Sequence, residues 1–168
     1  MASVVEIVEA RTRDELRQVG ELMAEWCRWL EVEHGVDLTY QAVEAELAGL
    51  PGDYSPPLGR VWLARTVSGA PAGCVALRPL DDDICELKRM YVRPGYRGAG
   101  LGRALAVRAL DTAGQIGYRL VRLDTARFLT AANRLYADLG FREIEPYYRV
   151  PPDMLKLTVF MERTVDRR

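Results

Sequence analysis

Residues 97–102 read Arg97-Gly98-Ala99-Gly100-Leu101-Gly102, and this glycine-rich stretch joins two segments of predicted regular structure. Before it, residues 84–92 are rich in branched and aromatic side chains, a composition typical of a β-strand. After it, apolar side chains recur at helical spacing from Leu101 to Ala113. The stretch therefore predicts a strand, a tight glycine loop and a helix in direct succession.

The glycine loop predicts an anion site. Backbone N–H groups at the start of a helix are free to bind an anion, and glycine lets a ligand approach the backbone closely. Arg97 and Arg103 bracket the loop and supply charge-assisted hydrogen bonds to phosphate oxygens. The alternative is a tight turn with two solvated arginines. Glycines at every second position, together with both arginines, favour a pyrophosphate as the ligand.

Two well-known nucleotide-binding loops fit this stretch poorly. A P-loop ends in Gly-Lys-Ser/Thr, whereas Gly102 is followed by Arg103. A dinucleotide-binding loop has the pattern G-x-G-x-x-G, which Gly98 and Gly100 begin but Arg103 breaks. Asp124, at the end of the next predicted strand, would be the ribose ligand in that fold. The loop begins so late in the chain, however, that too few residues remain for six parallel strands.

The rest of the chain predicts a mixed sheet with helices. Apolar alternation and turn residues predict strands over residues 3–10, 59–67, 72–80, 84–92, 119–125, 141–145 and 155–162. Helical spacing predicts helices over residues 12–35, 39–48 and 130–139, besides the helix that follows the glycine loop. Thr12 and Glu15 form a capping box at the first of these helices. Strands 84–92 and 119–125 flank a crossover helix, which predicts that they are parallel.

Composition limits the classes of protein. With 168 residues, 49% hydrophobic and 28% charged, the chain is expected to fold as one domain over residues 1–168. Its 23 basic and 24 acidic residues give a net charge of −1, so we expect no nucleic-acid or membrane partner. Three dispersed cysteines and one histidine favour neither a disulfide framework nor a metal site. The chain has no signal-peptide pattern or long apolar run, and we expect a cytoplasmic protein.

Several motifs together resemble one family. The stretch 97–102 is similar to the R-x-x-G-x-G signature of the GNAT N-acetyltransferases, and residues 87–94 resemble the strand that precedes it. Residues 132–141 read Ala-Asn-Arg-Leu-Tyr-Ala-Asp-Leu-Gly-Phe and resemble the family's helix with Asn and Tyr that ends in Gly-Phe. The order of elements is similar over nearly the whole chain, although the specific part is residues 84–141.

This resemblance implies an α/β fold. The expected GNAT fold is a central, twisted, mostly antiparallel sheet of about seven strands, flanked by about four helices. One parallel strand pair lies at the site of acetyl-CoA, the expected acyl donor. The implied pyrophosphate-binding residues are Arg97, Gly98, Ala99, Gly100, Leu101, Gly102 and Arg103. The pantetheine arm is expected to pair with the backbone of Met90, Tyr91 and Val92.

Transfer of an acetyl group to an amine requires a neutral amine, and therefore a proton acceptor. Glu86 is the candidate base, because Glu86 and Lys88 interrupt a strand that is expected to be buried on both faces. Glu86 also resembles, by its place six residues before Val92, the general-base glutamate of the histone acetyltransferase branch. The alternative is a structural ion pair between Glu86 and Lys88 or Arg89.

Tyr136 is the candidate general acid that protonates the departing thiolate. It lies three residues after Asn133, so both side chains lie toward the same side of a helix. In the family, the matching positions contact the cofactor and act as the acid. The alternative is that Tyr136 only packs under the sheet. A backbone N–H near Met90 is expected to polarise the thioester carbonyl.

The expected reaction is direct attack of a primary amine on acetyl-CoA in a ternary complex. The resemblance also implies an acceptor pocket near the first helices and the penultimate loop. The candidate lining residues are Trp29, Glu33, Tyr40, Tyr147 and Tyr148, and ordinary packing is the alternative for each. Trp26 is expected in the core and His34 at the surface end of a helix. The sequence leaves open the identity of the amine and whether the protein forms a homodimer. A non-catalytic acyl-CoA sensor is the alternative function, and an NAD enzyme is a more distant one.

Overall fold

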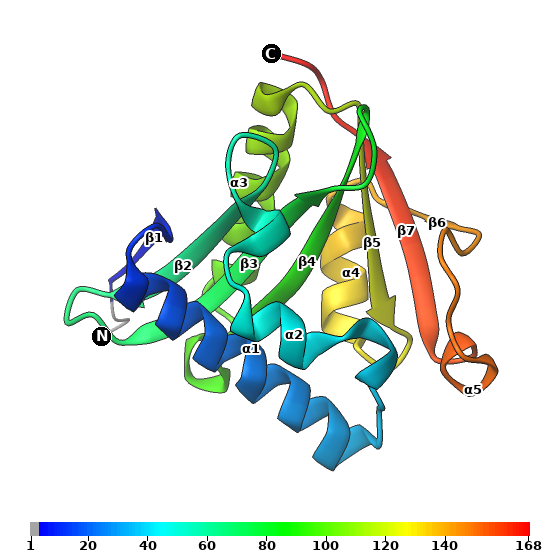
Figure 1. The fold of residues 1–168 in the computed structure, drawn as a ribbon, viewed down its shortest axis with the longest axis horizontal. Coiled ribbons are helices and arrows are strands. Elements are labelled where there is room, and N and C mark those ends of the chain that lie inside the picture. The colour runs from blue at the N-terminus through cyan, green and yellow to red at the C-terminus, as the bar shows by residue number, and fades with distance from the viewer. Residues whose placement is uncertain (1–3) are drawn as a thin grey trace.

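The computed structural model describes residues 4–168 and shows a single seven-stranded sheet in the order β1-β2-β3-β4-β5-β7-β6 (Figure 1). The strands are β1 (Val5–Glu9), β2 (Arg60–Thr66), β3 (Pro71–Pro79), β4 (Ile84–Val92), β5 (Leu120–Ala126), β6 (Arg142–Ile144) and β7 (Thr158–Thr164). All neighbouring strands pair antiparallel except β4 and β5. The predicted mixed sheet with one parallel pair is therefore confirmed. Ser3, where the first strand is predicted to begin, lies outside the described residues.

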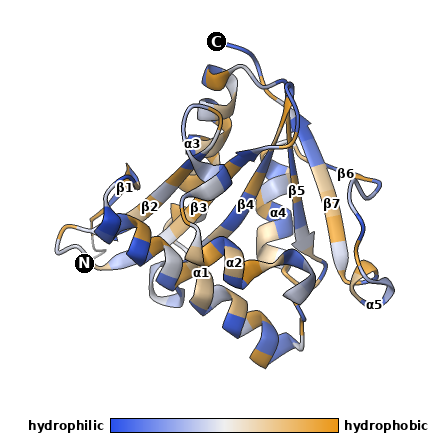
Figure 2. Ribbon diagram, viewed as in Figure 1, coloured by the Kyte–Doolittle hydropathy of each residue, from blue (hydrophilic) through white to orange (hydrophobic). Residues whose placement is uncertain are grey.

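Helices cover both faces of the sheet. They are α1 (Arg13–His34), α2 (Val43–Ala48), α3 (Leu101–Ile116), α4 (Thr130–Asp138) and α5 (Pro152–Leu155). In Figure 1, α1 and α2 lie on one side of the sheet, and α3 and α4 on the other. Two of the three core clusters lie on these faces: one includes Leu22 and Met23 of α1, and the other includes Leu105 and Ala109 of α3. Figure 2 shows hydrophobic residues along the central strands, where both faces are covered.

Local signals fix the long first helix. Thr12 accepts from the backbone N–H of Glu15, and the Glu15 carboxylate accepts from the backbone N–H of Thr12, so the predicted capping box is present. Gly35 ends the helix at φ 62°, a left-handed conformation that glycine adopts without steric cost. The apolar stripe of α1 packs on the sheet, with Val19, Leu22 and Met23 fully buried. This packing holds the C-terminal half of α1 beside β4.

The pairing of β4 with its two neighbours creates an opening in the sheet. β4 is in register with β5 only from Ile84 to Glu86, and beyond this point no pairing joins the two strands. On the other side, the register with β3 shifts between Cys74 and Ala76, which oppose Tyr91 and Lys88. β4 thus has one extra residue there, and Arg89 adopts a φ of 55° in this bulge. The second half of β4 therefore presents an unpaired edge toward β5.

Three short segments differ from the predicted elements. Residues 39–48 form a 3-10 turn (Thr39–Gln41) and the short α2 rather than one helix. The last strand is predicted over residues 155–162 but spans Thr158–Thr164, because α5 occupies the preceding residues. α5 is a single turn with Pro152 at its start, and a segment this short carries little periodicity.

No helix within residues 4–168 combines the length and apolar character needed to cross a membrane.

Candidate functional site

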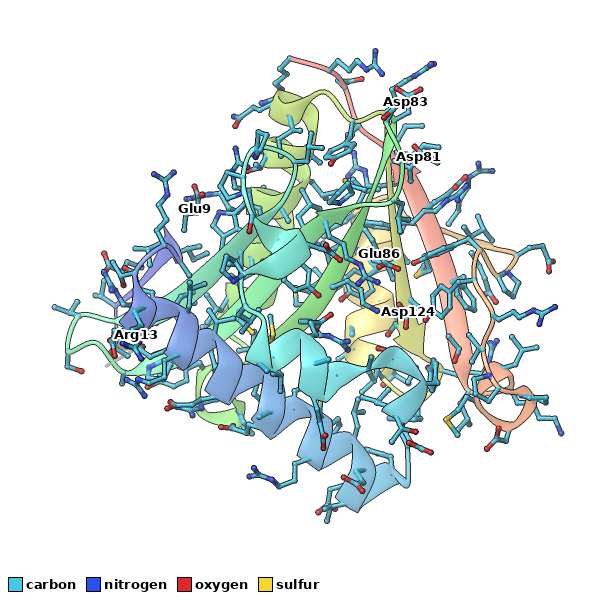
Figure 3. The ribbon with its side chains drawn as sticks, viewed as in Figure 1. Glu9, Arg13, Asp81, Asp83, Glu86 and Asp124 are labelled. Atoms are coloured by element: carbon cyan, nitrogen blue, oxygen red, sulfur yellow. The ribbon has the colours of Figure 1, made fainter. Side chains whose placement is uncertain are left out.

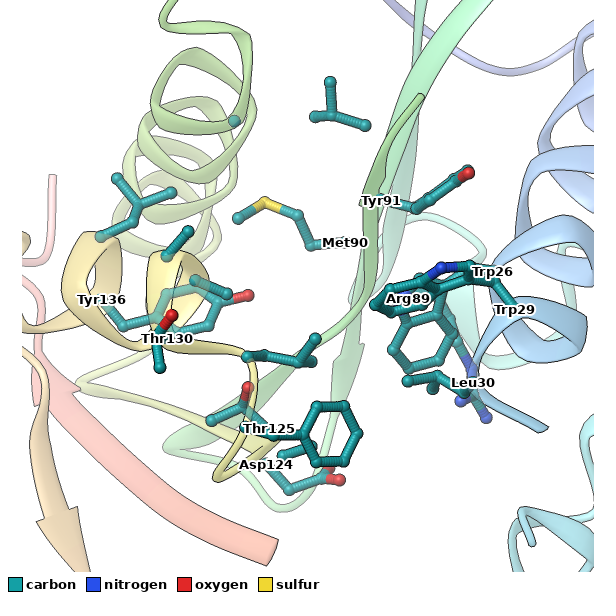
Figure 4. Close-up of a pocket in the computed structure, with 18 of the residues that line it drawn as sticks. Trp26, Trp29, Leu30, Arg89, Met90, Tyr91, Asp124, Thr125, Thr130 and Tyr136 are labelled. Carbon is teal, nitrogen blue, oxygen red and sulfur yellow. The ribbon is translucent and has the colours of Figure 1, made fainter. Parts of the chain in front are cut away.

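A cavity of about 640 Å³ occupies the opening between β4 and β5. Figure 4 shows Met90 and Tyr91 on β4, with Tyr136 and Thr130 of α4 on one side and Trp26, Trp29 and Leu30 of α1 on the other. Strand β5 supplies Asp124 and Thr125. The cavity thus extends from the α3 and α4 face of the sheet to the α1 face. Its existence follows from the early end of the β4–β5 pairing.

One end of the cavity is the glycine loop. Gly98, Gly100 and Gly102 line it, together with Arg97 and Arg103. Gly100 caps α3 at φ 81° without a side-chain hydrogen bond, so the first backbone N–H groups of α3 have no partner within the helix. Partial positive charge at a helix start and two guanidinium groups form a site for phosphate oxygens. The Arg97 Nε donates to the Val92 carbonyl at 2.8 Å, which holds this arginine beside the end of β4.

The second half of β4 forms one wall of the cavity. Met90, Tyr91 and Val92 all line it. The Tyr91 hydroxyl donates to Glu25 of α1 at 2.8 Å, so this side chain is held on the α1 face while Met90 packs toward the other. Because β5 is not paired to this part of β4, backbone donors and acceptors on this edge are available to an extended ligand.

Two of the predicted cofactor residues lie outside the cavity lining. Ala99 is exposed between the two positive-φ glycines. The Asn133 Nδ2 donates to the carbonyls of Ala126 and Arg127, at 3.0 and 3.3 Å, and so holds the loop between β5 and α4. The Asn133 Oδ1 is buried without a hydrogen-bond partner in the described residues. The position of Asn133 fits a side chain that orders the cavity wall.

Glu86, the predicted base, is completely buried on the α1 and α2 face of β4 and does not line the cavity. Its Oε1 accepts from Arg78 at 2.8 Å, because the two residues are cross-strand neighbours in β3 and β4. Its Oε2 accepts a short hydrogen bond from the Tyr147 hydroxyl. Burial and the adjacent carboxylate raise the pKa of Tyr147, which therefore stays protonated as a donor. Both carboxylate oxygens of Glu86 thus have partners.

Asp124 is the carboxylate that lines the cavity. It lies on β5, next to the strand that carries Glu86 (Figure 3). The Lys88 Nζ donates to Asp124 Oδ1 at 3.0 Å. Burial opposes the charge on Asp124, but the ammonium of Lys88, its hydrogen bond and the charge of Arg89 together hold the pKa of Asp124 below its ordinary value. Asp124 is therefore an ionised carboxylate at neutral pH, only 11% exposed at its side chain.

Tyr136 lines the cavity from α4, as Figure 4 shows. Its ring packs edge-on against Phe141, with centroids 5.7 Å apart. Burial and the nearby charge of Asp124 raise the pKa of the Tyr136 phenol. The group therefore stays protonated over the range in which proteins are assayed. The Tyr136 hydroxyl is therefore a hydrogen-bond donor in the cavity wall, and its raised pKa makes it a weaker acid than a free phenol.

The predicted acceptor residues divide into two groups. Trp29 and Tyr40 line the cavity, and Trp26, predicted to lie in the core, is half-buried and lines it as well. Glu33 is exposed on α1, away from the lining. Tyr147 and Tyr148 also lie outside the lining, although Tyr147 contacts Glu86. His34 ends α1 and stacks on Phe128, with ring centroids 4.1 Å apart.

Two cavity residues were missed by the sequence reasoning about catalysis. The sequence predicts Asp124 only as the ribose ligand of a dinucleotide fold, yet its place near the C-terminal end of a strand parallel to β4 is a signal for a ligand site. No sequence pattern near Arg89 predicts its place in the cavity, because it reaches the α1 face through a bulge that no glycine marks.

Within residues 4–168, no group of three His, Cys, Asp or Glu side chains is placed to hold a metal ion.

Known proteins are similar to this chain in sequence and in fold. The model of the acetyltransferase (GNAT) family matches residues 20–141. An uncharacterized N-acetyltransferase of Schizosaccharomyces pombe is 41% identical over 133 residues, which cover 78% of this chain and 82% of that protein. An acetyltransferase of the GNAT family from Staphylococcus aureus has the same fold, with a TM-score of 0.77, 23% identity, and coverage of 96% of this chain and 99% of that one. The PaiA N-acetyltransferase of Thermoplasma acidophilum, solved with coenzyme A, aligns with a TM-score of 0.72, 18% identity and coverage of 96% and 99%.

Proposed function

Because the chain belongs to the acetyltransferase (GNAT) family and is an acyltransferase, we propose that it transfers an acetyl group from acetyl-CoA to a primary amine in a ternary complex. The observation that supports this most is the cavity itself. It connects a phosphate-binding helix start to an ionised carboxylate and a protonated phenol. An acyl-CoA sensor would need the first of these features but neither of the other two.

The residues present fit acetyl-CoA. The glycine loop leaves open space at Gly98 and Gly100, where a Cβ would meet no protein atom within 4 Å. Its pyrophosphate would bind the N–H groups at the start of α3 together with Arg97 and Arg103. The unpaired edge at residues 90–92 would pair with the pantetheine arm. When bound, acetyl-CoA supplies a thioester carbonyl carbon to which the amine nitrogen bonds as the carbon–sulfur bond breaks.

The chain's own groups would move two protons. Asp124 would hold the incoming ammonium and accept its proton, because it is the carboxylate in the cavity lining. Tyr136 would give a proton to the sulfur as it leaves. A backbone N–H of residues 90–92 would stabilise the negative charge that develops on the carbonyl oxygen. The sequence predicts Glu86 for this same role, and amide variants of Glu86 and of Asp124 show which of the two carboxylates accepts the proton.

The test of the proposed function is turnover. Purified protein is mixed with acetyl-CoA and a panel of primary amines, and release of the CoA thiol is followed over time. We expect steady release that depends on one class of amine. Binding of acetyl-CoA without release for any amine would support the sensor and contradict the proposed transfer.

Exchange of Tyr136 for phenylalanine is expected to lower the turnover number by roughly tenfold. This loss is smaller than the 10²–10⁴-fold loss typical when an acid–base group is removed, because a thiolate with a pKa near ~8.5 also leaves unassisted. Acetyl-CoA affinity should survive, since the ring and its contact with Phe141 remain. The measurement is the steady-state rate as a function of pH.

The shape of that pH profile is part of the prediction. An unperturbed phenol ionises near ~10, but the pKa of Tyr136 is raised by burial and by Asp124. Wild type and Tyr136→Phe should therefore show parallel profiles up to a pH of about 10. An unchanged turnover number would show that Tyr136 only packs, and a wild-type alkaline limb that is absent from the variant would contradict the raised pKa.

A further inference from the structure

Three charged residues of β4 form ion pairs with residues of neighbouring elements, and the charges of these largely buried pairs sum to zero. Glu86 pairs with Arg78 at 2.8 Å, Lys88 with Asp124 at 3.0 Å, and Arg89 with Glu46 at 2.7 Å. Three cations thus face three anions on the α1 and α2 face of the sheet. Burial makes an additional net charge costly at this place. A ligand that enters beside this set is favoured if its own charges sum to zero.

Arg89 belongs to this set and also lines the cavity. Its side chain is only 2% exposed. The Nε donates to Glu46 at 2.7 Å and the Nη1 donates to Gln41 at 2.9 Å. Within residues 4–168 the Nη2 has no hydrogen-bond partner, although a guanidinium has five N–H donors. A buried cation at the cavity wall therefore keeps donors that no described residue uses.

The apolar wall of the cavity adjoins Arg89. Figure 4 shows Trp26, Trp29 and Leu30 on the same side of β4 as Arg89, while Asp124 lies on β5 at the base of the opening. Charged side chains are largely absent from the α1 part of this wall. Away from the glycine loop, the cavity therefore offers an acceptor one carboxylate, one guanidinium and an aromatic surface, together with the polar groups of Tyr40 and Gln41.

We infer that the acceptor is an α-amino acid with an apolar side chain, whose carboxylate binds Arg89 and whose ammonium faces Asp124. The inference rests on the proposed function and names the class of amine. An unused N–H of Nη2 can donate to a carboxylate oxygen, and the acceptor's side chain lies against Trp26 and Trp29. A simple alkylamine would enter as an uncompensated cation and leave the donors of Arg89 unused. The zwitterion adds no net charge.

The experiment compares wild-type kcat/KM for matched pairs of acceptors: phenylalanine with phenethylamine and with phenylalaninamide, and leucine with isopentylamine. We expect the amino acid to exceed its carboxylate-free partner by about 10- to 100-fold, as is typical for a charged hydrogen bond. Aspartate tests the side-chain assignment and should be the weaker acceptor. Equal or faster turnover of the amines would overturn the inference while leaving the proposed function in place. Binding of acetyl-CoA without turnover of any acceptor would overturn both.

A variant of Arg89 tests whether this residue causes the preference for acceptors that carry a carboxylate. Arg89→Met is combined with Glu46→Gln, so that no buried carboxylate loses its partner. The advantage of phenylalanine over phenylalaninamide should shrink to within about twofold. The matched control is Arg122→Met combined with Glu162→Gln, which replaces another arginine–glutamate pair outside the cavity lining. A preference that persists in the double variant of Arg89 and Glu46 would overturn the role of Arg89. If that variant fails to fold, the wild-type comparison with the amide decides alone.

Discussion

Exchange of Asp124 for asparagine is expected to lower the turnover number by about 10²–10⁴-fold, the range typical for loss of a general base. The amide keeps the shape of the carboxylate and can still accept a hydrogen bond from Lys88, but it cannot take a proton. Acetyl-CoA binding should remain, because Asp124 is not among the residues proposed to hold the pyrophosphate or the pantetheine arm. Steady-state turnover and a binding isotherm for acetyl-CoA, measured on the same folded sample, check both expectations.

Glu86→Gln is the matched control for this variant. It removes the charge of a completely buried carboxylate on the neighbouring strand, outside the cavity lining. We expect a lower Tm, because Arg78 loses the closer of its two carboxylate partners, and a turnover number within a few-fold of wild type. The opposite pair of results, with Glu86→Gln inactive and Asp124→Asn active, would support the base predicted from the sequence.

Exchange of Gly100 for valine is expected to abolish the stabilisation that acetyl-CoA gives. At about a hundred times its dissociation constant, a ligand stabilises by ~2.7 kcal/mol, which raises the Tm of a domain of this size by roughly 5–10 °C. A side chain at Gly100 meets no protein atom within 4 Å, so it would fill the space through which a pyrophosphate reaches the start of α3. Thermal melting with and without acetyl-CoA measures the effect.

The control separates loss of binding from backbone strain. Gly100 has a φ of 81°, so valine there also strains the backbone. Gly117 ends the same helix at a φ of 111° and likewise has no atom within 4 Å of its would-be Cβ. Gly117→Val should lower the Tm comparably and keep the full shift with acetyl-CoA. A full shift in Gly100→Val would place the cofactor elsewhere.

The parts of the fold that could be predicted have local causes. A few neighbouring residues suffice to predict the capping box at Thr12 and Glu15 and the loop that contains Gly98 and Gly100. The predicted family and the mixed sheet with a parallel pair are confirmed. The short α5 was missed because a single turn has no periodicity to detect.

The charge pairing could not be predicted because it is set by contacts distant in sequence. Glu86 and Lys88 stand out as polar residues in a buried strand, and their burial is confirmed. Their partners, however, are Arg78 across the hairpin and Asp124 on β5. Arg89 turns toward Glu46 only because a bulge adds a residue to β4. Sequence alone therefore indicates that buried charges matter but not which carboxylate reaches the cavity.

The most direct measurement follows the acetyl group itself. Wild-type protein is incubated with acetyl-CoA labelled in the acetyl carbons and with an amine that supports CoA release, and the acceptor is examined by mass spectrometry. We predict that the label appears on the amine nitrogen in an amount equal to the CoA released, and that Asp124→Asn forms the same product far more slowly. Release of CoA with the label recovered as free acetate, or no release in the presence of bound acetyl-CoA, would contradict transfer to an amine.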